Sequence, residues 1–469
     1  MKVTYPNGAF DSLGYWPGGA LKFKRDRKGQ VTYYQYDGYN SGCGCMSSSR
    51  SRLAKKYYYD SLGQYLDSYG FAHPSDSVTY EYDKVGNRIK MVDSLGVTLY
   101  AYDDLNRLWS DSCGYLNVKK RYQYDMAGNR TSLKVYKGDD TTTCYLDQVY
   151  DSYDAANRAG RTIASGDTFD LSYWDTGTPK ELQYPNGATE AYGLTVRGYV
   201  DSIMTTDNSS NLWFKNRYMY NGLGDRTWQY VYQTRPGNTA LSDTFKYSYD
   251  GLRRLTRTIC PPAHNNGDTA TYSYDAMGNR VEKQSTYFGN TGYAIDNATN
   301  RITQAAGYYM NYDANGNWVK KWHGDTPVTD FDLTYDYENR LRSVTGVGYG
   351  AYYMNAYYNA DGVRLYKETN ADLCKKYIVD GMNTVVEQDA GGSLRYKYVY
   401  VNGMLLSKID ASGNKKYYHH DGLGSVIGLS NNTPAVTTAQ LFDDFGQWLY
   451  YDSNWDYYSY TGQEYDWPL

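Results

Sequence analysis

The sequence predicts an all-β protein in which β-hairpins stack side by side and extend one continuous sheet. A Tyr-x-Tyr-Asp core recurs at intervals of roughly 20–25 residues, a period typical of solenoids and repeat arrays. Tyrosine is the dominant aromatic residue, with 59 copies against 10 Phe and 10 Trp. Aromatic residues suit the half-buried surface of a pleated sheet. No amphipathic helical pattern of three turns or more accompanies these repeats.

The copies of the core are clear in the first third of the chain, looser in the middle, and clear again towards the C-terminus. Clear copies lie at Tyr34/Tyr36-Asp37, Tyr57/Tyr59-Asp60, Tyr80/Tyr82-Asp83, Tyr100/Tyr102-Asp103, Tyr122/Tyr124-Asp125, Tyr312-Asp313 and Tyr335-Asp336. The looser middle copies lie at Tyr173, Tyr218/Tyr220, Tyr247/Tyr249-Asp250 and Tyr272/Tyr274-Asp275. Short polar stretches separate them, such as residues 41–51 and 260–268, and these are predicted to be surface loops.

The segment YEYDKVGNRIK at residues 80–90 shows how one repeat is expected to fold. Side chains alternate along a strand, so Tyr80 and Tyr82 lie on one face. Asp83 opens a turn by bonding the backbone two residues on, and Gly86 takes the positive φ of that turn. The return strand then begins at Asn87. Because one hairpin is marginally stable in water, neighbouring repeats are expected to pair, with their tyrosines meeting across strands.

An arginine follows the turn in many repeats, and it has two interpretations. A row of arginines would bind a polyanion, or each arginine would act as a structural clamp that lies over a tyrosine ring or pairs with the turn aspartate. Because an aspartate accompanies most of these arginines, the sequence favours the clamp. The arginines are Arg88, Arg107, Arg130, Arg158, Arg226, Arg280, Arg301 and Arg340.

Composition argues against several classes of function. The net charge is −4 with acidic and basic residues interspersed, which gives no electrostatic support for nucleic-acid binding. No apolar run approaches about 18 residues, so no membrane span is expected. The start of the chain lacks the apolar region of a signal peptide and resembles the interior of a repeat, as at residues 181–190.

The six cysteines are too sparse for a disulfide framework. Cys43-Gly-Cys45 is too short for a zinc half-site and has no matching second half. Free thiols are therefore the favoured interpretation, and no metal is predicted.

The repeats carry a family resemblance. The pattern Y-x-Y-D-x-x-G-N-R at about 20-residue spacing resembles the tyrosine–aspartate (YD) repeats of the RHS family, over roughly Tyr5 to Tyr465. Bacterial polymorphic toxins, the C component of insecticidal toxin complexes and the animal teneurins contain such repeats. The resemblance implies a β-sheet that spirals around a hollow interior as a barrel-like shell or cocoon, in some members around an unfolded passenger.

The C-terminal part sharpens this resemblance. YYHHDGLGS at residues 417–425, FDDFG at 442–446 and YTGQEYD at 460–466 resemble successive elements of the RHS-associated core region. This divides the chain into a repeat region, residues 1–415, and the start of the core region, residues 416–469. In many relatives a later D-P-x-G-L motif supplies aspartates for self-cleavage and toxin release. That motif and a toxin domain are not in this sequence, so self-cleavage is assigned to no residue here.

No catalytic, cofactor-binding or metal-binding residue is predicted. His419, His420, Asp421 and Ser425 suggest a hydrolase triad, but adjacent histidines on a strand point to opposite faces and the nucleophile elbow is absent. A structural turn is favoured there instead. The remaining histidines and the paired acids are expected to lie in or beside turns. They are His73, His264, His323, Asp139-Asp140 and Asp443-Asp444.

Three functional hypotheses follow. The favoured one is a non-enzymatic shell, secreted or at the cell surface, that encloses or presents a polypeptide such as a C-terminal toxin. The alternative is a cell-surface adhesin or filament subunit that binds glycans through exposed tyrosines or self-associates through strand edges. A carbohydrate-active enzyme would need two acids about 5–10 Å apart in a groove, and the sequence offers no support for one.

Overall fold

The computed structural model describes residues 1–5, 8–37, 52–62, 65–66, 77–140, 142–237, 239–260, 269–324, 329–346, 352–370, 374–452, 454 and 456–465. These residues form 40 strands and one 3-10 turn, η1 (Tyr460–Gly462), which confirms the all-β prediction. The chain divides into two compact units. Unit 1 comprises Met1–Gln123, Lys134–Tyr145 and Tyr293–Ser393, and unit 2 comprises Tyr124–Leu133, Leu146–Gly292 and Leu394–Leu469.

Four strands have residues in both units, namely β11 (Val118–Tyr124), β12 (Arg130–Lys137), β13 (Cys144–Asp151) and β25 (Thr291–Asp296). The other strands of unit 1 are β1 (Lys2–Thr4), β2 (Phe10–Tyr15), β3 (Leu21–Arg25), β4 (Val31–Tyr36), β5 (Leu53–Tyr59), β6 (Tyr65–Leu66), β7 (Ser77–Tyr82), β8 (Arg88–Asp93), β9 (Gly96–Tyr102), β10 (Leu108–Cys113), β26 (Arg301–Ala305), β27 (Tyr308–Tyr312), β28 (Trp318–His323), β29 (Thr329–Tyr335), β30 (Leu341–Gly346), β31 (Tyr352–Tyr358), β32 (Arg364–Thr369), β33 (Lys375–Asp380) and β34 (Asn383–Gln388).

The other strands of unit 2 are β14 (Arg161–Ala164), β15 (Asp167–Tyr173), β16 (Pro179–Gln183), β17 (Thr189–Leu194), β18 (Val200–Thr206), β19 (Leu212–Tyr220), β20 (Arg226–Thr234), β21 (Ala240–Tyr249), β22 (Leu255–Ile259), β23 (Thr269–Tyr274), β24 (Arg280–Ser285), β35 (Leu394–Val401), β36 (Met404–Asp410), β37 (Lys415–His420), β38 (Val426–Asn431), β39 (Val436–Phe442) and β40 (Trp448–Tyr451). The predicted boundary between residues 415 and 416 lies at the start of β37 and stays a prediction.

Strands that follow one another in sequence pair antiparallel, as β7 does with β8 and β19 with β20. β5 differs because it pairs with β6 near its end and with β7 nearer its start. The register shifts by one residue at the second tyrosine of many repeats, for example at Tyr82, Tyr249 and Tyr335. Such a bulge increases local twist and turns the strand at the hairpin end.

The predicted aspartate turn is confirmed. Asp83 Oδ1 accepts the backbone N–H groups of Val85, Gly86 and Asn87 at 3.0, 2.7 and 2.8 Å, and Gly86 has φ +118°. In a second kind of turn, Asn106 takes the positive φ instead of glycine, at +61°. Asparagine tolerates this conformation better than other residues with a side chain.

Successive turns are joined along one edge of the sheet. Where asparagine follows the glycine, its amide bonds its own turn aspartate and the asparagine of the next turn, as Asn87 does with Asn106 at 2.9 Å. Where arginine takes that place, it bonds its own aspartate and a carbonyl of the next turn. Arg158 thus reaches Asp154 at 2.6 Å and the Trp174 carbonyl at 2.9 Å.

The clamp interpretation of the arginines is therefore confirmed. Three of them pair with the aspartate of their own turn, namely Arg107, Arg158 and Arg340, and Arg254, which was not predicted, does the same. Others lie over aromatic rings: the guanidinium of Arg88 is 4.7 Å from the Tyr100 ring, and that of Arg130 is 5.1 Å from the Tyr150 ring. Arg226, Arg280 and Arg301 also lie over rings.

The second tyrosine of nine described repeats has a role that the sequence did not reveal. Its hydroxyl donates to a backbone carbonyl at or near the start of the return strand of the preceding hairpin, at 2.6–3.1 Å. The acceptors lie 10–29 residues earlier in the chain. The donors are Tyr82, Tyr102, Tyr153, Tyr173, Tyr220, Tyr249, Tyr274, Tyr312 and Tyr335. A phenylalanine could not make this link.

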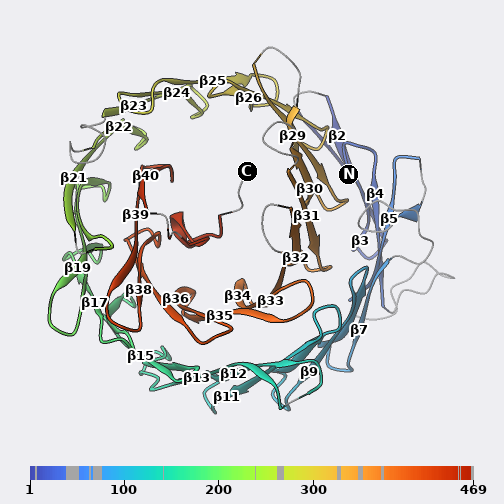
Figure 1. Ribbon diagram of the computed structural model, residues 1–469. Helices are drawn as coiled ribbons and strands as arrows, with labels where there is room; N and C mark the ends of the chain where they lie inside the picture. The colour runs from blue at the N-terminus through green and yellow to red at the C-terminus, as the bar shows by residue number, and fades with distance from the viewer. Residues whose placement is uncertain are drawn as a thin grey trace. The chain divides into compact units, whose positions relative to one another are not determined.

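Each unit packs later strands against earlier ones. In unit 1, Lys56 pairs with Glu338 at 2.6 Å, and Arg88 pairs with Asp361 at 2.6 Å. Figure 1 shows β30 and β31 beside β3 and β4. The buried side chains of Tyr58, Val78 and Met91 form part of the core, with Tyr337 packed against them.

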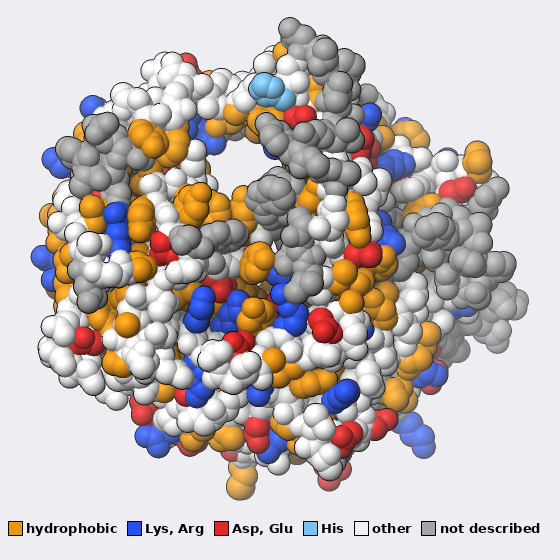
Figure 2. All heavy atoms as spheres, viewed as in Figure 1, with side chains coloured by type: hydrophobic (Ala, Val, Ile, Leu, Met, Phe, Trp, Pro, Cys, Tyr) orange, Lys and Arg blue, Asp and Glu red, His pale blue; other side chains and the backbone are white. Residues whose placement is uncertain are grey.

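The third residue of the turn is often apolar and exposed. Leu105, Leu223, Leu252 and Met277 expose 66%, 68%, 74% and 78% of their surface. On the face of the molecule in Figure 2, hydrophobic side chains are scattered among acidic and basic ones. In the described part of the chain, no helix has the length and apolarity that crossing a membrane requires.

Replacing Tyr335 by Phe should lower the free energy of unfolding by about 1 kcal/mol, because the Trp318 carbonyl loses its 2.9 Å hydrogen bond. Tyr353→Phe is the matched control, since that side chain is 38% exposed. It should change stability by less than about 0.5 kcal/mol. Urea unfolding measures both, and equal effects of the two variants would contradict the role given to the hydroxyl.

Candidate functional site

The C-terminal segment, defined as residues 415–465, lies against the earlier hairpins of unit 2. Figure 1 shows β38 and β39 beside β17, β19 and β21. The Tyr184 hydroxyl donates to the Tyr418 carbonyl at 2.7 Å, and both side chains are buried. Gln233 Nε2 donates to the Gln440 carbonyl at 2.6 Å. Polar contacts with the backbone thus fix the register of the segment.

Buried ion pairs also hold the C-terminal segment against the earlier hairpins; this contact region is called the seat of the segment. Lys283 Nζ lies 2.8 Å from Asp443 Oδ2, and Lys415 pairs with Asp167. Each cation comes from one layer and its carboxylate from the other. Removing one member of such a pair would leave an uncompensated charge in the interior, which is strongly destabilising.

Residues 456–465, the end of the C-terminal segment, fold back over β36 and β37. Asp456 is buried and binds Lys408 Nζ at 3.0 Å and the Tyr418 hydroxyl at 3.1 Å. Burial opposes ionisation of Asp456, but the Lys408 ammonium holds the pKa of that carboxyl below its usual range. The Ser425 hydroxyl accepts the Thr461 N–H at 3.1 Å, and the Tyr457 carbonyl accepts the Tyr465 N–H at 2.7 Å.

The adjacent histidines are both buried in this seat. His419 Nε2 lies 2.9 Å from Ser430 Oγ, and its Nδ1 lies 3.8 Å from Glu190 Oε2. Burial lowers the pKa of His420 to about 4, so this ring is neutral at physiological pH.

Asp421 and Ser425 contact each other within one turn, whereas His419 pairs with Ser430 and Glu190. Asp421 Oδ1 accepts the N–H groups of Leu423 and Ser425, while Ser425 Oγ is bound by Thr461. Asp421 opens a turn, as the sequence predicted. The prediction that the chain contains no catalytic residue stays a prediction.

Asp443 and Asp444 also lie in a turn, but their environments differ. Asp443 Oδ1 accepts the N–H groups of Phe445 and Gln447, as in the other turns. Asp444 Oδ2 accepts the hydroxyls of Thr258 at 2.5 Å and Tyr272 at 2.9 Å. Burial raises the pKa of Asp444 to about 6.

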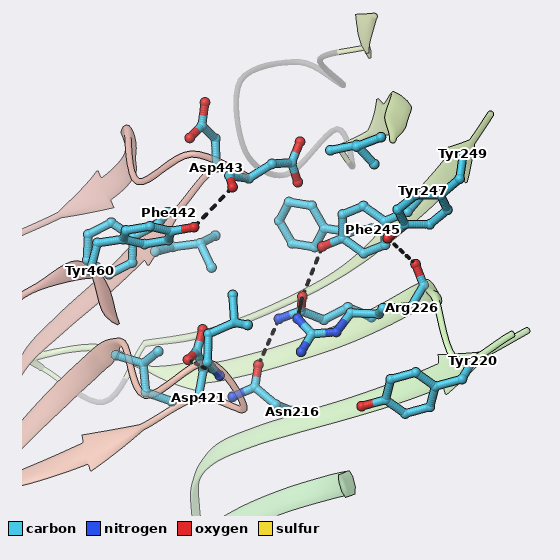
Figure 3. A pocket seen from close by; sticks show the side chains of 17 residues that line it. Asn216, Tyr220, Arg226, Phe245, Tyr247, Tyr249, Asp421, Phe442, Asp443 and Tyr460 are labelled. Atoms are coloured by element: carbon cyan, nitrogen blue, oxygen red, sulfur yellow. Dashed lines mark hydrogen bonds between the residues drawn. The ribbon is translucent and has the colours of Figure 1, made fainter. Parts of the chain in front are cut away.

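A cavity of about 310 Å³ lies between β19–β22 and the C-terminal segment. Figure 3 shows Asn216, Arg226 and Tyr247 entering it from the earlier strands, and Asp421, Phe442 and Tyr460 from the segment. Buried Phe245 and Leu441 form apolar parts of its wall.

The polar wall of the cavity is incompletely paired. The guanidinium of Arg226 lies 4.1 Å from the Tyr218 ring centre, and its Nη1 donates to Gln229 Oε1 at 3.4 Å. Asn216 is 1% exposed, and its Nδ2 has no hydrogen-bond partner. Asp421 faces them, and burial raises the pKa of its carboxyl. The arrangement can accept a small polar molecule.

Sequence reasoning missed Glu190, Lys408 and Asp456. None lies in a repeat motif, and their partners are up to 229 positions away in the chain, as His419 is from Glu190. Glu190 and Lys408 lie in β17 and β36, and Asp456 lies outside the strands, so no common sequence pattern indicated them.

The other residues considered as site candidates from the sequence lie apart from this cavity or outside the described residues. His323 is exposed at the end of β28 with its ring 5.1 Å from that of Tyr308. Asp139 is exposed beside Lys119, and Asp140 accepts from Thr142. No three described His, Cys, Asp or Glu side chains form a group able to hold a metal. Cys43, Cys45, His73 and His264 lie outside the described residues.

The antiparallel hairpin array with its tyrosine–aspartate turns resembles the fold of the RHS/YD-repeat proteins. The crystal structure of TcdB2–TccC3 matches 99% of this chain and 26% of that chain, with a TM-score of 0.78 and 15% identity. The Tc holotoxin pore of Photorhabdus luminescens matches 98% of this chain and 25% of that chain, with a TM-score of 0.74 and 15% identity.

Sequence comparison finds similarity to curated proteins that are named as tRNA nucleases. The tRNA3(Ser)-specific nuclease WapA of Bacillus spizizenii is 27% identical over 226 residues, which are 46% of this chain and 9% of that protein. The tRNA nuclease WapA of Bacillus subtilis is 26% identical over 226 residues, which are again 46% of this chain and 9% of that protein. The chain thus spans less than a tenth of these curated relatives. No family model matches the chain. Together the comparisons confirm the predicted resemblance to the RHS/YD-repeat family and its all-β fold.

Replacing Lys408 by Met should lower the free energy of unfolding by about 3–5 kcal/mol, because Asp456 would keep a buried and unpaired charge. Adding Asp456→Asn should recover most of this loss. Urea unfolding and limited proteolysis after residue 450 measure the effect. A cost below about 1 kcal/mol for the single variant would contradict the structural importance of the pair.

Asp444→Asn should stabilise the protein in a pH-dependent way. The carboxyl titrates near 3.8 when unfolded and at about 6 when folded. The folded state therefore binds the proton more tightly, and its stability falls as pH rises between these values. The difference in unfolding free energy between variant and wild type should be about 3 kcal/mol more favourable to the variant at pH 8 than at pH 3. Asparagine can still accept from Thr258 and Tyr272. A pH-independent difference would contradict the assignment.

Proposed function

We propose that the chain is a non-enzymatic RHS/YD-repeat scaffold that encloses or presents a polypeptide cargo such as a C-terminal toxin. The observation that carries this proposal is the match of nearly the whole chain to part of the TcdB2–TccC3 structure. The WapA relatives are named as nucleases, and the part that this chain matches is a small share of them. In the proposal, the enzymatic activity of such proteins lies outside this part.

The seat of the C-terminal segment supports the same proposal. Its buried ion pairs and backbone contacts hold residues up to Tyr465 against the hairpins of unit 2. A polypeptide that follows this segment would start from a fixed position on the scaffold. Residues 416–469 would then act as the attachment region between the repeats and the cargo.

The similarity of this chain to toxin proteins also supports a secreted or cell-surface location. Self-association and glycan binding, the alternative function, stay predictions, because no contact or distance among the described residues favours them over the scaffold.

The test uses the full chain with an unstructured, protease-sensitive reporter peptide joined either after Leu469 or before Met1. A scaffold that encloses its cargo should slow cleavage of the C-terminal reporter at least about tenfold relative to the N-terminal reporter, while the scaffold band stays intact. Lys408→Met should remove part of this protection. Equal cleavage of both reporters on an intact scaffold would contradict enclosure.

A further inference from the structure

We propose that the cavity in unit 2 binds a free α-amino acid, whose carboxylate contacts Arg226 and Asn216 and whose ammonium group contacts Asp421 and Asp444. This inference goes beyond the scaffold function, and either one can fail without the other. It depends on unpaired charges that face one another across a cavity.

Arg226 has no anion in direct contact, although the charge of Asp421 acts on it at longer range. No carboxylate lies within 4.0 Å of its guanidinium nitrogens among the described residues. Its neighbours are the Tyr218 ring and the Gln229 amide oxygen. Arg88 holds the same place in its repeat in unit 1, yet it binds both oxygens of Asp361 at 2.8 and 2.6 Å. A guanidinium has a planar fork of donors that matches a carboxylate, and in unit 2 no described carboxylate occupies that fork.

Asn216 supplies a second donor to the same end of the cavity. Its Oδ1 accepts from Gln229 Nε2 at 3.1 Å, which orients the amide. Its Nδ2 is left without a partner although the residue is 1% exposed. A buried donor without an acceptor is costly, so a ligand acceptor that contacts Nδ2 would be favourable.

The carboxyl groups of the opposite wall have no cation in direct contact, although Arg226 acts on Asp421 and Lys283 on Asp444 at longer range. Asp421 binds backbone N–H groups, and Asp444 binds two hydroxyls. No Lys, Arg or His nitrogen lies within 4.0 Å of either carboxyl in the described chain. Burial disfavours both charges, and a ligand ammonium group would compensate them.

These charges select among ligand classes. A simple anion would meet two carboxyl groups, and a simple cation would meet Arg226. A peptide bond within a chain brings neither charge, whereas a free amino acid brings both. A cavity of about 310 Å³ is at the lower end of ligand pockets, which suits one such molecule. Phe245, Ile427 and Leu441 in the wall favour an apolar side chain, as in leucine or phenylalanine.

Isothermal titration of the full chain with L-leucine and L-phenylalanine tests the proposal. At least one should bind with a Kd below about 1 mM. N-acetyl-L-leucine lacks the ammonium group and L-leucinamide lacks the carboxylate, and each should bind at least about tenfold more weakly than L-leucine. No binding of either amino acid at about 10 mM, or equal binding of the blocked compounds, would overturn the proposal.

Arg226→Lys keeps the charge and removes the fork, and it should weaken binding at least about tenfold. The matched control is Arg130→Lys, since Arg130 follows its turn at the same place, lies over Tyr150 and does not line the cavity. It should leave the Kd unchanged. Asn216→Ala is a second variant with the same expected loss, and near-ultraviolet circular dichroism reports whether each variant is folded. Equal weakening by the Arg130 and Arg226 variants, or full affinity of folded Asn216→Ala, would overturn the assigned contacts.

Discussion

The hydrogen bond from the second tyrosine of a repeat to the preceding hairpin is the interaction on which this fold depends. One hairpin of two short strands is marginal in water, so the repeats need links between hairpins as well as within them. Tyr102 reaches the Arg88 carbonyl and Tyr249 the Arg226 carbonyl by this route. The body of the ring packs on the sheet while the hydroxyl satisfies a backbone acceptor. This explains why tyrosine, and not phenylalanine, is the dominant aromatic residue.

The turns provide a second link at the strand ends. Aspartate organises each turn, and either asparagine or arginine at the fifth position extends the contact to the next turn, as Asn87 and Arg158 do. The tyrosine links and the turn links act at different places on the same hairpin pair. A shift of register by one residue would break both and move every side chain to the other face. Both kinds of link join neighbouring hairpins and so specify the array locally.

This locality decides what the sequence could predict. The turn of Asp83 and Gly86, the pairing of Arg107 with Asp103 and the antiparallel order all follow from residues close in the chain. The pairing of Arg88 with Asp361 does not, because 273 positions separate them and only the packing of one layer on another joins them. The tyrosine link was missed for a related reason, since its acceptor is a backbone carbonyl and carries no side-chain pattern.

The contacts between the C-terminal segment and the earlier hairpins show what interactions between distant parts of the chain contribute. Apolar packing alone would tolerate small slides of one β-layer on another, because alternating side chains present similar surfaces after each shift of two residues. Buried pairs such as Lys408 with Asp456 and Lys283 with Asp443 do not tolerate a slide, since each carboxylate would lose its cation in the interior. They add little net stability compared with well-packed apolar residues, yet they select one placement. Arg226 and Asp421 come from the two layers without making a direct ion pair, and a cavity remains between the layers there.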